Sequence, residues 1–175
     1  MFLCVALAWL PAPASAQATV QETQVKAAYL SKFASYAEWP EARLGEDASP
    51  LVIGVVGADA LAGELEAQTR GQSVRGHPIT VRRLAADGPL TEAHVLFVGP
   101  TDAPTLDAMF ERLRGQPVLT VADSRQAQER GSMITFLVRS QRLRFEVAVP
   151  PATESRIRLS ALLLTAATRV VREQR

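Results

Sequence analysis

One uninterrupted apolar run, Leu51–Val56, constrains the fold more than any other feature of the sequence. Pro50 and Gly57 bound the run, so it has the length of a strand and lacks a polar face. A strand of this kind is typical of the centre of a parallel sheet, where both faces are covered. Other apolar segments of strand length follow it. These further expected strands are 79–84, 94–98, 118–121, 133–138 and 143–149.

Segments with apolar residues at three- and four-residue steps are expected to be helices. They are 22–38, 59–69 and a segment around 106–113. Trp39-Pro40 is expected to end the first helix, because the residue before a proline is disfavoured in the α region. Ser160 is expected to cap a last helix over 161–172. Since this helix carries no charge before Arg169, we expect it to be buried in the domain or at a subunit contact.

The order of these elements predicts the fold class. The polar link Arg139–Arg142 separates two strands and predicts a β-hairpin, and Arg156–Leu159 alternates like a short extended piece. We therefore expect an α/β fold, a single-domain sandwich with a largely parallel central sheet flanked by helices, followed by a C-terminal β-hairpin and helix. No linker, repeat or low-complexity stretch divides the sequence.

Composition narrows the class of protein. The chain has 175 residues, of which 47% are hydrophobic and 21% charged, so it can bury a core without a metal or a disulfide. Its 19 basic and 18 acidic residues nearly cancel, giving a net charge of +1. A nucleic-acid-binding protein normally carries a clustered basic surplus, so we expect no nucleic acid among the partners.

The N-terminal segment predicts export. Met1–Leu10 is apolar and uncharged, and Ala14-Ser15-Ala16 resembles a signal-peptidase site. We expect residues 1–16 to be a signal peptide and 17–175 to be the folded domain. The single cysteine, Cys4, lies in the expected signal peptide. The mature protein would then have no disulfide, no thiol nucleophile and no cysteine-based zinc site.

Motifs that carry catalytic chemistry are not assembled in the sequence. The turn Val56–Asp59 matches neither a dinucleotide-binding nor a phosphate-binding loop, and no nucleophile elbow occurs. His77 is expected to face solvent in a turn, His94 to open a strand, and Asp123-Ser124 to cap a helix. We expect no catalytic residues, metal or cofactor, and an enzyme would require Asp123, a histidine and a serine to meet in the fold.

Arginine is the one polar residue type that gathers in the C-terminal third. The cluster consists of Arg139, Arg142, Arg144, Arg156 and Arg158, opposed by Glu146 and Glu154. Alternation places Arg144 and Glu146 on the same face of the second hairpin strand. This is either a solvated face with an Arg144–Glu146 pair or a patch that binds a partner, since guanidinium groups suit bidentate contacts to carboxylates.

Two stretches resemble the YfiR-like family of periplasmic proteins. Residues 25–40 are similar to the family's opening signature, and 131–136 followed by 144–147 are similar to its second signature. The segments between them fall in the order that the family shows. The resemblance implies a periplasmic, non-enzymatic regulator that binds and represses the periplasmic portion of an inner-membrane diguanylate cyclase, controlling cyclic-di-GMP and biofilm formation. It also implies an outer-membrane lipoprotein that sequesters the regulator, while other family members neighbour sensor kinases or receptors.

The sequence departs from the family pattern at three places. Thr135 and Ala148 stand at positions where the family has asparagine, and Ser160-Ala161-Leu162 stands where it has Ser-Ser-Lys. Cysteine pairing links repression to redox state in family members. Because the expected mature chain has no cysteine, redox control is not expected here.

Two functional hypotheses remain open. The first is a protein-binding repressor, acting as a homodimer, whose affinity comes from a few aromatic or arginine anchors. The expected binding residues are Tyr36, Trp39, Arg144, Glu146 and Arg158. Ordinary packing at the helix end is the alternative for both aromatic residues. The second hypothesis is a sensor of a small carboxylate or amino acid, held by arginines in a cleft at the carboxyl edge of the sheet.

Overall fold

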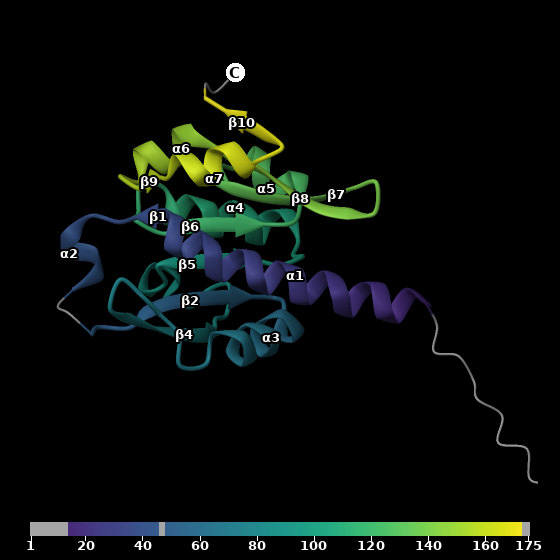
Figure 1. The fold of residues 1–175 in the computed structure, drawn as a ribbon. Helices are drawn as coiled ribbons and strands as arrows, with labels where there is room; N and C mark the ends of the chain where they lie inside the picture. Colours follow the sequence, from purple (N-terminus) through teal and green to yellow (C-terminus); the bar gives the residue numbers. More distant parts are fainter. Residues whose placement is uncertain (1–13, 46–47, 173–175) are drawn as a thin grey trace, which may run out of the picture.

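A central eight-stranded sheet organises the molecule (Figure 1). The computed structural model describes residues 14–45 and 48–172. The strands run in the spatial order β10-β8-β7-β6-β5-β2-β4-β3. Their bounds are β2 Leu51–Val56, β3 Ser73–Val74, β4 His77–Arg83, β5 Val95–Val98, β6 Leu119–Ala122, β7 Ile134–Arg139, β8 Arg142–Ala148 and β10 Arg169–Val171. Each expected strand is present within two residues of its predicted bounds, and the predicted α/β fold with a largely parallel sheet is confirmed.

The sheet is parallel from β4 to β7. The strand β2 pairs in parallel with both β4 and β5, and β6 continues the parallel order to β7. The predicted hairpin is formed by β7 and β8, which are antiparallel. Its two turn residues, Ser140 and Gln141, have φ angles of 50° and 58°. Such a turn follows the right-handed twist of the strands, so the hairpin projects from the body of the domain (Figure 1).

Helices cover the two faces unequally. On the first face lie α1 Ala14–Tyr36, α3 Asp59–Thr69 and α7 Ala161–Ala166. On the second face lie α4 Ala103–Leu113, the 3₁₀ turn η1 Leu90–Glu92 and the short α5 Arg125–Glu129. Two further helices, α2 Glu41–Leu44 and α6 Val149–Glu154, connect strands. Within the described ranges, no helix combines the length and apolarity needed to cross a membrane.

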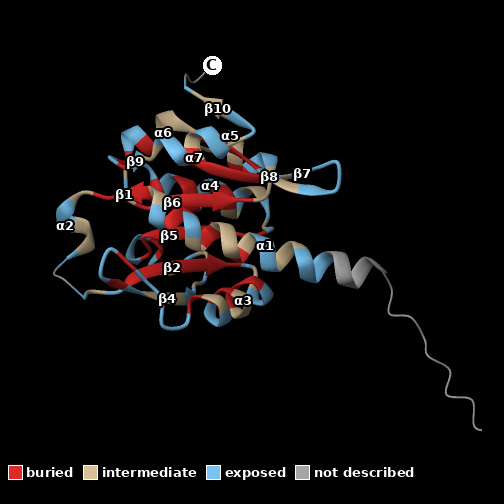
Figure 2. Ribbon diagram, in the orientation of Figure 1, coloured by how far each residue is buried: buried red, intermediate tan, exposed pale blue. Residues whose placement is uncertain are grey.

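Aromatic rings fill the core between α1 and the sheet. Phe33 of α1 packs edge-on against Phe145 of β8, with ring centroids 5.0 Å apart, and stacks on Phe136 of β7 at 5.7 Å. Tyr29 contacts the same two rings. Figure 2 shows the buried residues concentrated in the strands and on the inner sides of the helices, while the hairpin tip is exposed. The helical spacing of α1 therefore serves to hold it across β7 and β8.

The first helix differs from its prediction at both ends. It begins at Ala14 rather than residue 22, and it ends at Tyr36 because Ala37–Glu38 forms strand β1. This strand pairs antiparallel with β9, Arg158–Leu159, in a separate two-stranded sheet. Backbone pairing with β9 thus ends the helix before Trp39-Pro40 is reached. Residues 1–13 of the predicted signal peptide lie outside the described residues, so the signal peptide and the domain boundary after residue 16 stay predictions.

The prediction of a long, buried last helix is wrong. Ser160 does cap the helix, accepting a hydrogen bond from the Leu163 backbone at 3.2 Å, but α7 ends at Ala166. Leu163 is buried, whereas Leu162 is 60% exposed. The chain then extends into β10, which pairs in parallel with β8 at the edge of the sheet. The β-branched residues of this segment fit a strand better than a helix, and β8 offered a free edge.

Candidate functional site

The second face of the sheet lies open over β8 and β10. Beyond α4 this face is covered by the single short helix α5, which packs on β7. The strand register places Arg144 opposite Leu137, and Arg142 opposite Arg139. Because side chains alternate along a strand, Arg142, Arg144 and Glu146 all point to this face, as predicted. Polar side chains of β8, and no further helix of the described chain, therefore line this part of the second face.

Glu146 is the buried centre of this surface. Its residue is 6% exposed, and its carboxylate accepts a hydrogen bond from Gln128 of α5 at 2.9 Å. Arg139 lies 3.4 Å from one carboxylate oxygen, and Arg169 of β10 lies 4.0 Å from the other. The predicted Arg144–Glu146 pair is not formed, because residues two apart on a strand are farther apart than cross-strand neighbours.

Five arginines lie on the open face, two of them in contact with this carboxylate, and we call the five the arginine stripe. They are Arg125, Arg139, Arg142, Arg144 and Arg169. All five are exposed. Within the described part of the chain, Arg125, Arg142 and Arg144 form no ion pair or hydrogen bond through their side chains. The stripe is thus a cationic surface with a single, already shared, buried carboxylate.

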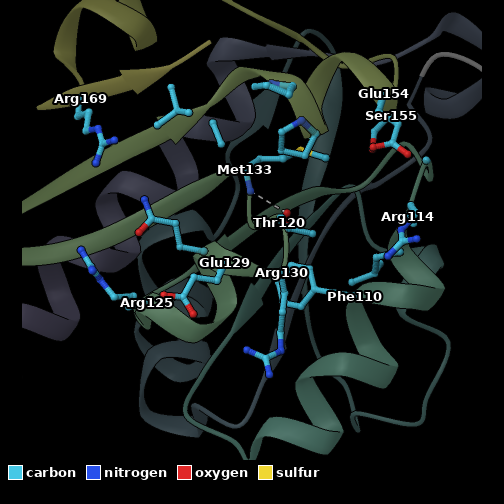
Figure 3. Close-up of a pocket in the computed structure, with 18 residues that line it drawn as sticks. Phe110, Arg114, Thr120, Arg125, Glu129, Arg130, Met133, Glu154, Ser155 and Arg169 are labelled. Atoms are coloured by element: carbon cyan, nitrogen blue, oxygen red, sulfur yellow. Dashed lines mark hydrogen bonds between the residues drawn. The ribbon is translucent and has the colours of Figure 1, made fainter. Parts of the chain in front are cut away.

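A cleft of about 790 Å³ adjoins the stripe. Its partly exposed apolar lining consists of Ala148, Pro150, Pro151 and Val171, whereas the lining residues Phe110, Leu113 and Met133 are buried. Figure 3 shows Arg125 and Arg169 at one end of the cleft and Arg114, Glu154 and Ser155 at the other. The cleft thus combines a limited apolar lining with charged ends.

The polar groups of the cleft differ in whether they already have ion-pair or hydrogen-bond partners. Arg130 pairs with Asp107 at 2.6 Å and Arg114 with Glu111 at 2.8 Å, so these two arginines are occupied. Ser155 lines the cleft, and its hydroxyl reaches solvent without a hydrogen-bond partner among the described residues. This hydroxyl is therefore available to bond a group bound in the cleft.

The cleft is not where a carboxylate site was expected. Its residues Thr120 and Met133 stand at the amino ends of β6 and β7, not at the carboxyl edge of the sheet. At the carboxyl ends of β2 and β5, Gly57 and Gly99 approach so closely that a Cβ on Gly99 would lie 2.7 Å from the Gly57 carbonyl oxygen. Backbone therefore occupies the point where strand order reverses, at which open α/β sheets commonly bind ligands.

The five expected binding residues do not form one surface. Trp39 is 7% exposed and donates its indole N–H to the His94 carbonyl oxygen at 3.2 Å, so it is a core residue. Tyr36 is partly buried against the same first-face core. Arg158 pairs with Glu38 at 2.7 Å beside the small sheet, away from the stripe. Arg144 and Glu146 alone lie together on the open face.

The two histidines and Asp123 serve structural contacts. The prediction that His77 faces solvent is wrong, because it is buried at the start of β4 with Nδ1 2.8 Å from the Ser49 carbonyl oxygen. His94 lies just before β5, where its Nδ1 accepts a hydrogen bond from the Val52 backbone at 3.0 Å. Asp123 pairs with Lys26. Ser124 caps α5, as predicted.

Sequence reasoning missed three members of the site. The sequence places Arg169 in the expected last helix. Arg125 and Gln128 belong to α5, whose capping turn was predicted but whose extent was not. A helix of five residues gives too short a period to recognise. The β-branched pair Val170-Val171 was the available signal for β10.

Comparison with known proteins identifies a family. No curated protein matches the chain. A model of the YfiR/HmsC-like family matches residues 23–168, which include every strand of the central sheet except β10. The matched region also contains the open face with Glu146 and most of the arginine stripe. The chain therefore belongs to the YfiR/HmsC-like family.

Proposed function

We propose that this protein binds the periplasmic region of an inner-membrane diguanylate cyclase and represses it. YfiR/HmsC-like proteins are periplasmic regulators of diguanylate cyclase signalling and act with signalling partner proteins. Family membership supports a role in the regulation of diguanylate cyclase signalling. That the partner is the cyclase itself, and that binding represses it, is what we propose beyond the family.

The observation that carries the proposal is the open second face of the sheet. Helices usually cover both faces of a largely parallel sheet. On the second face of this sheet, β8 and β10 instead present exposed arginines. Interfaces are enriched in arginine because its guanidinium makes several hydrogen bonds from one rigid group. The buried Glu146 holds Arg139 and Arg169 in place, so part of the surface is preorganised before a partner arrives.

Capture from inner membranes tests the proposal. Tagged protein exported to the periplasm is cross-linked, the membranes are solubilised, and the captured proteins are identified by mass spectrometry. We expect a diguanylate cyclase with a periplasmic region to be enriched, and cellular cyclic-di-GMP to rise several-fold when the gene is deleted. Recovery of no inner-membrane signalling protein, together with unchanged cyclic-di-GMP, would contradict the proposal.

A matched pair of variants connects the capture to the open face. Arg144→Glu reverses an unpaired charge in the arginine stripe, and Arg70→Glu reverses an exposed, unpaired arginine after α3 at the other end of the sheet. We expect Arg144→Glu to reduce capture of the cyclase and to raise cyclic-di-GMP toward the deletion level. Arg70→Glu should behave like the wild-type protein.

Two further interactions belong to the proposal. An outer-membrane lipoprotein would sequester the regulator and release the cyclase, and the regulator itself would act as a homodimer. Exposed apolar residues on α7 and α1, namely Leu162 and Val25, are the surface that a second copy could cover. Co-capture of an outer-membrane lipoprotein under conditions that raise cyclic-di-GMP tests the first of these interactions.

A further inference from the structure

The arginine stripe carries electrostatic repulsion that Glu146 relieves only at Arg139 and Arg169 within the described chain. Arg139 stands directly opposite Arg142 in the hairpin, and like charges in this position destabilise an antiparallel pair. Arg144 follows on the same face, and neither it nor Arg142 has a carboxylate partner among the described residues. Glu146 is the one acid on this strand face, and two other arginines already share it. Carboxylates from another molecule would remove the repulsion.

The stripe and the cleft form one continuous surface. Arg142 lies at one end of β8, and Ala148 at the other end lines the cleft. Six residue steps along the strand separate them, which corresponds to about 20 Å. Val171 of β10 is paired with Ala148 and lines the cleft as well. Arg169, a member of the stripe, stands two residues before Val171 on the same face and also lines the cleft. An extended segment of about six residues spans this length.

From this geometry we infer that the open face binds an acidic segment of the partner protein, which lies along β8 with its carboxylates on the arginine stripe and one large apolar side chain in the cleft. The inference rests on the proposed function and specifies the chemistry of its partner. The partly exposed apolar residues Pro150, Pro151 and Val171 of the cleft receive the anchor. The unpartnered Ser155 hydroxyl is placed to bond a backbone group of the segment.

A protein segment fits the surface better than a smaller ligand does. Arg144 lies four strand residues from Ala148, or about 13 Å. A free amino acid is shorter than this distance, so it would fill the cleft and leave the repulsion along the hairpin unchanged. Charge complementarity over the whole stripe therefore requires a chain with several carboxylates.

Peptide binding to the full-length protein tests the inference. The probe is a fluorescein-labelled peptide of alternating glutamate and alanine with one central tryptophan, followed by anisotropy. Two control peptides carry glutamine for glutamate or serine for tryptophan. The protein variants are the double reversal Arg142→Glu/Arg144→Glu and the matched Arg70→Glu, with folding of each verified by circular dichroism and urea denaturation.

The expected result is salt-sensitive binding of the acidic, tryptophan-containing peptide and weaker binding of both control peptides. Reversing two charges removes two exposed ion pairs and adds repulsion, so the double variant should bind the peptide at least about tenfold more weakly. Arg70→Glu should bind like the wild-type protein. Equal binding of the glutamine peptide, equal binding by the double variant, or no binding would overturn the inference.

Other occupants give distinguishable outcomes. Complete displacement of the peptide by free tryptophan or glutamate would show a small-ligand cleft, and binding of phosphatidylglycerol vesicles in place of the peptide would show a lipid surface; either result overturns the inference. The proposed function is tested separately by capture. If the wild-type protein and the double variant capture the cyclase equally, this inference fails and the proposed function stands, whereas no capture at all removes the proposed function.

Discussion

Lys26 of α1 and Asp123, the residue after β6, form an ion pair 97 positions apart in the sequence, with Nζ 3.0 Å from Oδ2. Lys26 also pairs with Glu22 on its own helix at 2.7 Å. Both members of the long-range pair are largely buried, with 14% and 21% of their side chains exposed. The pair therefore fastens the long helix to the carboxyl edge of the sheet, on the side where the helix extends beyond the body (Figure 1).

Replacing Lys26 by methionine should lower the free energy of unfolding. The variant keeps the aliphatic stem but leaves Asp123 partly buried without its cation, which we expect to cost about 1–3 kcal/mol. Urea denaturation at neutral pH measures the loss. Lys32→Met removes an exposed lysine from the same helix and should change the free energy of unfolding by less than about 0.5 kcal/mol. Equal effects of the two substitutions would show that the pair does not stabilise the fold.

The contribution of Lys26 should depend on alkaline pH. Burial lowers the pKa of Lys26, but its hydrogen bonds to Glu22 and Asp123 outweigh burial, and the net pKa is raised above 10.5. A raised pKa in the folded state favours the protonated lysine, so the stabilisation is complete below 10.5 and disappears as the pH rises through the folded-state value. The difference between wild type and Lys26→Met should narrow above pH 10.5. A constant difference would contradict this assignment.

Trp39→Phe should weaken the fold without weakening partner binding. The substitution removes the buried indole hydrogen bond to the His94 carbonyl and leaves unfilled volume, for an expected cost of about 1–3 kcal/mol. Tyr36→Phe is the matched control, because Tyr36 is partly exposed and its hydroxyl has no partner in the described ranges. Denaturation and capture of the cyclase are measured on the same preparations. If folded Trp39→Phe no longer captured the cyclase, Trp39 would be part of the binding surface.

His94 should make the fold sensitive to mild acid. Burial, with Arg43 nearby, lowers the pKa of His94 below 6.5. Its Nδ1 accepts from the Val52 backbone, which places the proton on Nε2, where it is donated to the Arg43 carbonyl oxygen at 3.1 Å. The unfolded chain binds a proton near pH 6.5 and the folded protein does not, so stability falls as the pH drops below 6.5.

Urea denaturation at two pH values checks the role of His94. The free energy of unfolding should fall more between pH 7 and pH 5 for the wild-type protein than for His94→Gln, which cannot titrate. Surface carboxylates contribute equally to both proteins and cancel in the comparison. The same pH dependence in both would mean that His94 is protonated alike in the folded and unfolded states.

The strands of the central sheet could be predicted from the sequence, whereas the bounds of the first and last helices and the strand β10 could not. An apolar run of six residues such as Leu51–Val56 predicts a strand, because a central strand of a parallel sheet is the element of that length that buries every side chain. The last segment is different, since Leu162–Leu164 is equally apolar and forms a helix with one face exposed. Its end at Ala166 depends on the free edge of β8, and a tertiary contact of this kind leaves no local pattern.

The candidate site was predictable only on one strand. Alternation in β8 correctly placed Arg144 with Glu146, because both lie on the same element. The partners of Glu146 come from α5, β7 and β10, so the carboxylate is shared by residues that only the sheet order brings together. Residue type leaves the role of Trp39 open, because aromatic residues anchor interfaces and fill cores alike. Its burial in the structure favours packing in the core.

Leu162→Asp should dissociate the proposed homodimer. Leu162 is 60% exposed on α7, so a charged residue at this position should cost little in the folded monomer but is strongly disfavoured in an apolar interface. Sedimentation velocity should show a dimer for the wild-type protein and a monomer for the variant at the same concentration. Thr165→Asp changes another exposed position of the same helix, one turn away, and serves as the matched control. A monomeric wild-type protein would remove the homodimer from the proposal, and an unchanged dimer of Leu162→Asp would remove α7 from the interface.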